Sequence, residues 1–68
     1  MNPDELMATA LENTAAADEG LRAIGKVGRV QPVPAQMLTI VLARLRTATS
    51  AVQELELRAR GHETGKQG

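Results

Sequence analysis

The side chains best suited to chemistry are His62, the adjacent acids Asp18 and Glu19, and the serine and threonine hydroxyls. His62 is the only histidine, and it lies in a polar, glycine-rich stretch where we expect no fixed partner for it. Neighbouring helical residues point about 100° apart, so Asp18 and Glu19 do not form a catalytic carboxylate pair. The hydroxyls have no adjacent base in the sequence. The sequence therefore predicts no catalytic residues and no enzymatic activity.

Metal and cofactor sites are not indicated either. The chain has no cysteine, which removes both disulfides and thiolate ligands. One histidine cannot assemble a zinc site without ligands from elsewhere. We expect no metal site and no cofactor.

A basic segment at residues 25–29, Gly-Lys-Val-Gly-Arg, is the clearest candidate for ligand binding. Glycines free backbone N–H groups, and basic side chains pair with phosphate. The spacing lacks the pattern of a phosphate-binding P-loop, and solvated bases at a capped helix end explain the segment better. With further bases nearby, the segment could form one wall of an anion pocket at a subunit boundary. The candidate residues are Arg22, Lys26, Arg29, Arg44 and Arg46.

Nucleotides, cyclic nucleotides and nucleic acids are the ligands that such a pocket would take. Eight basic and eight acidic residues leave no overall basic surplus, and the chain has no aromatic residue for base stacking. Arg44 and Arg46 also project about 200° apart on a helix, so they cannot both face one surface. Anion binding is therefore the alternative interpretation.

The first positioning element is a helix predicted over about residues 3–25. Asn2 is a good N-cap, Pro3 suits the first turn, and Glu5 follows the cap by three residues. Gly25 and Gly28 indicate the end of the helix. Leu6 and Leu11 widen an apolar stripe with spacings of three and four. The stripe consists of Met7, Ala10, Thr14, Ala17, Leu21 and Ile24.

Two prolines, Pro32 and Pro34, predict a stiff, extended linker over residues 27–33, because each restricts the residue before it. Such a linker can reverse the chain into a hairpin or hold the helices apart for a swapped partner. The sequence leaves both arrangements open.

The second helix is predicted over about residues 34–60, ending at Gly61, with a disordered tail over residues 61–68. Glu54 with Arg58, and Glu56 with Arg60, are well-oriented i,i+4 pairs. Apolar residues nearly encircle residues 37–45, and a helix of that kind needs more than one neighbour. The predicted oligomer interface comprises Met37, Leu38, Val41, Leu42, Leu45, Ala48, Val52 and Leu55.

The small size of the chain also favours an oligomer. A chain of 68 residues without disulfides is most readily stabilised by association of identical copies. Charge is segregated, since residues 1–19 carry five acids and no base whereas residues 20–50 carry five bases and no acid. These segments could pair within one chain or between chains. Alternatively, the basic segment faces an external anion.

We therefore expect an all-α protein of one domain, residues 1–60, that forms a helical hairpin or two helices with an extended hinge. It should assemble into an oligomeric helical bundle. No apolar run approaches the ~20 residues needed to span a bilayer, and the acids near the start do not resemble a signal peptide, so a cytoplasmic location is expected. The predicted function is protein interaction, as an adaptor, assembly factor or inhibitor of a larger partner.

Overall fold

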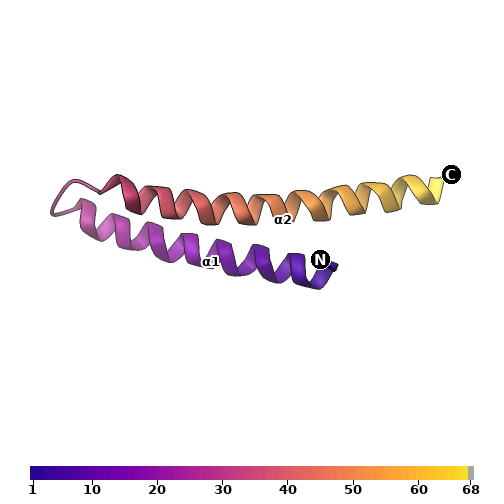
Figure 1. Ribbon diagram of the computed structural model, residues 1–68, viewed down its shortest axis with the longest axis horizontal. Coiled ribbons are helices and arrows are strands. Elements are labelled where there is room, and N and C mark those ends of the chain that lie inside the picture. The colour runs from indigo at the N-terminus through magenta and orange to yellow at the C-terminus, as the bar shows by residue number, and fades with distance from the viewer. Residues whose placement is uncertain (68) are drawn as a thin grey trace.

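The computed structural model describes the backbone of residues 1–67 and the side chains of residues 1–62. Helix α1 spans Pro3–Gly28 and helix α2 spans Ala35–Gln67. The two helices run antiparallel as a hairpin, and α2 extends past the start of α1 (Figure 1). The chain is a rod with principal extents of 59 × 16 × 15 Å. Within the described residues there are no strands, which confirms the all-α prediction and the hairpin form of it.

Helix α1 starts where its capping residues place it. The Asn2 side-chain oxygen accepts a hydrogen bond from the Glu5 backbone N–H at 2.8 Å. The Asn2 amide in turn donates to the Glu5 carboxylate at 2.9 Å. This reciprocal arrangement satisfies a backbone donor that the helix itself leaves unpaired, and it places Pro3 in the first turn.

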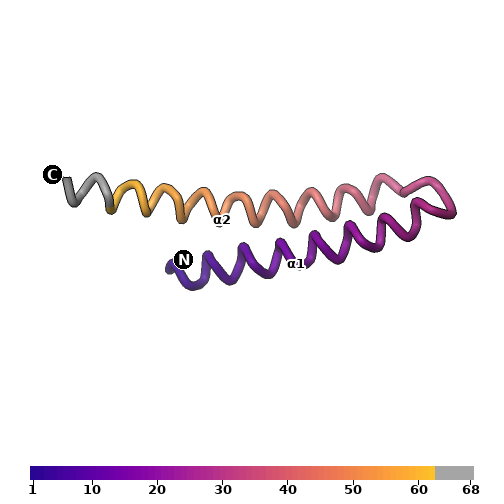
Figure 2. Tube along the Cα trace, turned by 180° about the vertical axis from the view of Figure 1, so that it is seen from behind, coloured from indigo at the N-terminus to yellow at the C-terminus, as the bar shows by residue number. Residues whose placement is uncertain are grey.

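Residues 29–34 reverse the chain between the helices (Figure 2). The Val30 and Gln31 N–H groups both donate to the Val27 carbonyl, at 3.1 and 3.0 Å. These bonds use a carbonyl at the end of α1 that has no partner within the helix. Gly28 lies close beneath Val33, because a methyl group at Gly28 would sit 3.3 Å from a Val33 methyl carbon. The sequence left hairpin and swapped arrangements open, and the described chain is a hairpin.

Both helices are longer than the sequence analysis expects. Helix α1 continues through Gly25 to Gly28, and α2 continues through Gly61 to Gln67. Neither Gly25 nor Gly61 has a positive φ, so these two glycines do not form left-handed caps here. The disordered tail expected over residues 61–68 falls on this extension of α2. Gly68 and the side chains of residues 63–68 lie outside the described part.

The contact between the helices is made mostly by small residues. Two contacts fix the register: Ala10 shares a cluster with Ala51, and a methyl group at Gly20 would lie 2.8 Å from a Val41 methyl carbon. The helices can approach this closely because alanine and glycine project little from the backbone. The buried apolar residues are Leu6, Ala10, Ala17, Val41, Ala48 and Ala51.

Ion pairs on the outside follow the i,i+4 spacing. Arg58 pairs with Glu54 at 3.2 Å and Arg60 with Glu56 at 3.4 Å, which confirms both predicted pairs. Arg22 forms a similar pair with Asp18 at 3.0 Å. All of these side chains are substantially exposed, so each pair stabilises its helix by only about 0.3–0.5 kcal/mol.

Candidate protein-interaction surface

The predicted interface residues of α2 separate into two groups in the structure. Val41 and Ala48 are buried in the contact between the helices, and Leu55 packs against the cluster formed by Leu6, Ala10 and Ala51. Met37 is half-buried. These residues belong mainly to the interior of the hairpin. The remaining four are exposed on the surface: Leu38 at 45%, Leu42 at 50%, Leu45 at 40% and Val52 at 53%.

Helix α1 adds a matching exposed stripe. Met7, Thr14 and Leu21 are seven residues apart, a spacing that returns to nearly the same side of a helix after two turns. Met7 is 51% and Leu21 50% exposed, and Leu11, at the outer edge of this stripe, is 64% exposed. The apolar stripe predicted for this helix contained Met7 and Leu21 together with Ala10 and Ala17, and Leu6 widened it. In the structure Leu6, Ala10 and Ala17 are buried, whereas Met7 and Leu21 are about half exposed.

The two stripes lie on the same side of the hairpin. Thr14 of α1 lines a surface hollow of about 320 Å³ together with Leu45, Thr49 and Val52 of α2. That shared hollow joins the stripes across the groove between the helices. We call this surface the lateral apolar face, and it consists of Met7, Leu11, Thr14, Leu21, Leu38, Leu42, Leu45 and Val52.

The opposite side of the hairpin has a second hollow, of about 370 Å³. It is lined by Thr9, Arg46, Thr47 and Ser50 together with the apolar residues Met1, Leu6 and Ala51. Here Arg44 donates a hydrogen bond to the Asn13 side-chain oxygen, at 3.5 Å, across the two helices. Arg44 thus contacts a neutral amide of α1.

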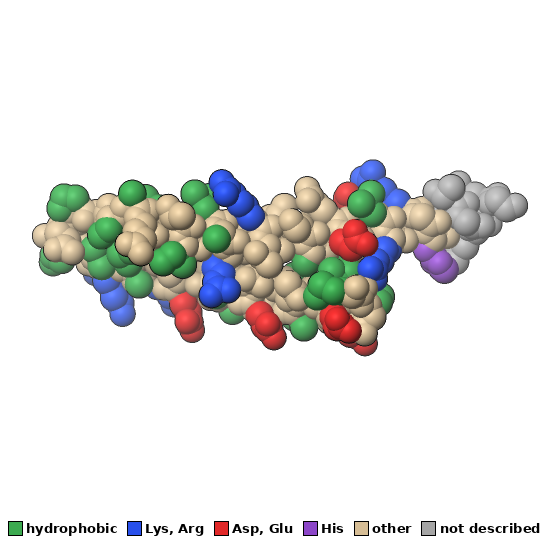
Figure 3. All heavy atoms as spheres, viewed as in Figure 1, with side chains coloured by type: hydrophobic (Ala, Val, Ile, Leu, Met, Phe, Trp, Pro, Cys, Tyr) green, Lys and Arg blue, Asp and Glu red, His purple; other side chains and the backbone are tan. Residues whose placement is uncertain are grey.

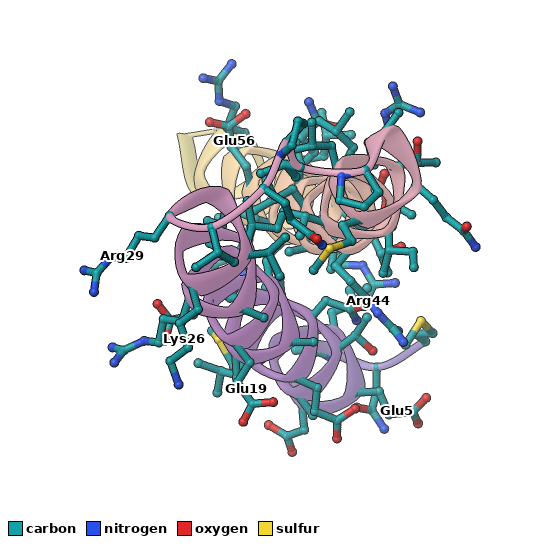
Figure 4. All side chains as sticks on the ribbon, turned by 90° about the vertical axis from the view of Figure 1, so that its left-hand side faces the viewer. Glu5, Glu19, Lys26, Arg29, Arg44 and Glu56 are labelled. Atoms are coloured by element: carbon teal, nitrogen blue, oxygen red, sulfur yellow. The ribbon has the colours of Figure 1, made fainter. Side chains whose placement is uncertain are left out.

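The candidate anion-binding residues do not all come together. Arg22, Lys26 and Arg29 line an open hollow of about 420 Å³ with Gly25 near the end of α1. Seen from the loop end, Lys26 and Arg29 project from one side of α1 and Arg44 lies on the other (Figure 4). Arg46 lines the separate hollow beside Thr47.

Helix electrostatics explain the basic hollow without a ligand. The C-terminal end of a helix carries partial negative charge, which favours nearby cations and disfavours a bound anion. Lys26 lies in the last turn of α1, where its charge stabilises that end. Arg22 pairs with Asp18 of the same helix, so two of the three bases already have a structural role in the hairpin.

Two negative findings complete the description of the surface. Among the described residues, no three histidine or acidic side chains gather as a metal site would require. None of the described helical segments is long and apolar enough to cross a bilayer.

In comparisons with known proteins, no family model, curated protein or solved structure matches this chain. We therefore base the functional proposal on the lateral apolar face and on the distribution of charge along the hairpin.

Proposed function

We propose that this protein is a small, oligomeric helical interaction module that works by presenting a helical surface. It acts in the cytoplasm as an adaptor, assembly factor or inhibitor of a larger partner, without chemistry of its own. The observation that carries the proposal is the lateral apolar face. An apolar surface that runs along both helices of a small protein is typical of a site that another protein covers.

The small interior of the hairpin supports self-association in particular. Among residues 1–62, whose side chains the structure describes, four of the six buried apolar residues are alanines and no large side chain is completely buried. Ordering each residue costs roughly 1.5 kcal/mol, and apolar burial offsets this at about 25 cal/mol per Å². Alanine contributes little area to that balance, whereas leucine contributes much. Since the leucines of the lateral apolar face remain exposed in a single chain, their burial by a second copy would supply the missing stabilisation.

The exposed area is also consistent with a dimer. A compact monomer of 7.2 kDa has an accessible surface of about 4,100 Å², whereas this chain exposes 5328 Å². Part of the excess comes from the end of α2 that extends past α1 (Figure 1). A typical specific interface covers about 800 Å² on each partner. The hairpin thus has enough unburied surface for one such interface along its length.

The anion-binding alternative has weaker support. Only three of its five residues share a hollow, and those three lie at a helix end that favours cations over anions. The apolar face, in contrast, has no role within the single hairpin. Protein interaction is therefore the better-supported function.

A matched pair of substitutions on α2 tests the role of the lateral apolar face. Leu45 lies on this face at 40% exposure, and Thr47, two residues along, lines the hollow on the opposite side. Leu45→Asp should convert the oligomer to monomer in sedimentation velocity, because a carboxylate would be buried in the interface. Thr47→Asp, with the same new charge on the same helix, should leave the mass unchanged.

Circular dichroism separates dissociation from misfolding in this experiment. Leu45 is 40% exposed in the single chain, so aspartate there also removes part of its packing within the hairpin. Dissociation to monomer is therefore the deciding readout, and retained helicity shows that it does not arise from misfolding. Equal mass of the two variants would contradict the proposal.

A further inference from the structure

Beyond self-association itself, on which this inference rests, the hairpin carries information about how two copies are oriented. Charge is distributed unevenly along the rod. The loop end carries Arg22, Lys26 and Arg29, and no acid occurs within residues 20–50. The end with the chain termini carries Asp4 and Glu5 on α1. Acidic side chains are also visible along the outer edge of α1 away from the loop (Figure 3).

Helix α2 adds charge of both signs at the terminal end. The register of the hairpin places its acids Glu54 and Glu56 beside the first two turns of α1, and each forms an i,i+4 pair with an arginine of α2. At the other end Arg22 pairs with Asp18, whereas Lys26 and Arg29 lie in a stretch, residues 20–50, that has no acid. The net result is a hairpin with a basic loop end and an acidic opposite end of α1.

The lateral apolar face is nearly symmetric about its own centre. On α2 its large residues Leu38 and Val52 each lie seven positions from Leu45. Reversing the direction of this stripe about Leu45 therefore superposes Leu38 and Val52 on one another, whereas Leu42 falls opposite Ala48. A twofold axis through Leu45 would match the stripe with a reversed copy of itself, as a self-complementary interface requires.

We propose that two hairpins pack by their lateral apolar faces in opposite directions, with a twofold axis that crosses both helices near Leu45. Each α2 then lies against the α2 of the second copy, with Leu38 facing Val52 of that copy. Each α1 lies against the other α1, and Leu21 comes near Leu11 of the second copy. The result is an antiparallel four-helix bundle.

Charge distinguishes this arrangement from its competitor. If the two hairpins packed in the same direction, the basic loop end of one copy would lie beside that of the other. The acids at the start of α1 would likewise lie beside those of the second copy. In the opposed arrangement, Lys26 and Arg29 of one copy lie over the end that bears Asp4 and Glu5 of the other. Like charges repel and opposite charges attract across an interface, so the opposed dimer is favoured.

The loop supplies a position for a direct test. Val30 is 83% exposed and lies in the turn, outside the lateral apolar face. The chain has no native cysteine, so Val30→Cys accepts a single spin label. At 1.5 Å per helical residue, the opposed dimer puts the two labels about 40 Å apart. Hairpins packed in the same direction put them within about 20 Å, given helix spacings of 8–10 Å.

Pulsed electron paramagnetic resonance on spin-labelled Val30→Cys measures the distance between the two labels, and light scattering on the same sample measures the mass. Together they distinguish three outcomes. A distance near 40 Å in a dimer supports the opposed arrangement. A distance near 20 Å in a dimer overturns this inference and leaves the proposed self-association standing. A monomer mass with no intermolecular distance contradicts the proposed function, and with it this inference.

A charge-reversal variant provides an independent check on the same inference. Lys26→Glu combined with Arg29→Glu should raise the dimer Kd severalfold at low salt, because acids would then lie over acids. The rise should largely disappear at 1 M salt, where the screening length falls to about 3 Å. Lys26→Gln with Arg29→Gln should have an intermediate effect. An unchanged Kd for the glutamate variant at low salt would contradict the opposed arrangement.

Discussion

At the scale of single residues, Asn2 determines how the first helix begins. Its side chain accepts from the Glu5 N–H and donates to the Glu5 carboxylate, so both partners are held at the start of α1. The exposed position of this pair means that its effect comes from hydrogen bonding and not from burial. Substitution there should therefore change the stability of the hairpin without altering its packing.

Asn2→Ala should lower the free energy of unfolding by about 1 kcal/mol, because it leaves a helix N–H unpaired. Asn2→Ser keeps an N-cap acceptor without placing a second carboxylate beside Glu5, so it should lose less stability than Asn2→Ala. Urea denaturation at one fixed protein concentration measures both. Equal stability of Asn2→Ala and the parent would show that the cap contributes nothing.

At the scale of the helices, two glycines of α1 have opposite roles. Gly20 lies at the closest approach to α2, where an added methyl group would come within 2.8 Å of buried Val41. Gly25 has no atom within 4 Å of its added methyl position. Both are in the helix interior, so alanine would improve helix propensity equally at both positions.

Gly25→Ala should therefore raise the free energy of unfolding by up to about 1 kcal/mol. Gly20→Ala should lower it, because overpacking against a stiff valine costs about 1–3 kcal/mol and exceeds the gain in propensity. Thermal denaturation of the two variants under identical conditions checks the difference. Stabilisation by both substitutions would mean that the helices do not approach closely at Gly20.

The same close approach explains what the sequence could and could not predict. Helix starts, the turn and the two-helix architecture follow from capping residues, prolines and spacing. Each helix, however, has two adjacent apolar stripes with the same spacing of three and four residues. One stripe consists mainly of small side chains and the other of large ones. The stripe predicted for the first helix contained both kinds, since it included Met7 and Leu21 together with Ala10 and Ala17. In the structure Ala10 and Ala17 are buried, whereas Met7 and Leu21 are about half exposed.

The candidate site was only partly predictable for the same reason. Leu38, Leu42, Leu45 and Val52 were predicted as interface residues and are exposed, whereas Val41 and Ala48 are used within the hairpin. The contribution of α1 was missed. Its signal was the seven-residue spacing of Met7, Thr14 and Leu21, but the choice between two stripes depends on which pair of helix surfaces meets, and that is a tertiary property.

At the scale of the whole molecule, the apolar side chains of the hairpin are small in the interior and large on the surface, which is the reverse of the usual distribution. Small residues fill the contact between helices, and several large aliphatic residues remain on one outer side. An isolated hairpin of this kind gains little from apolar burial, whereas a bundle of two hairpins would bury both sets. We therefore expect folding and association to be coupled.

Light scattering of the unmodified protein over a hundredfold range of concentration tests this account most directly. The central claim predicts a mass of twice 7.2 kDa or more at high concentration, with helicity falling as the mass falls on dilution. The coupling of folding to association is the reason for the joint decline. A mass of 7.2 kDa at every concentration, with full helicity throughout, would contradict it.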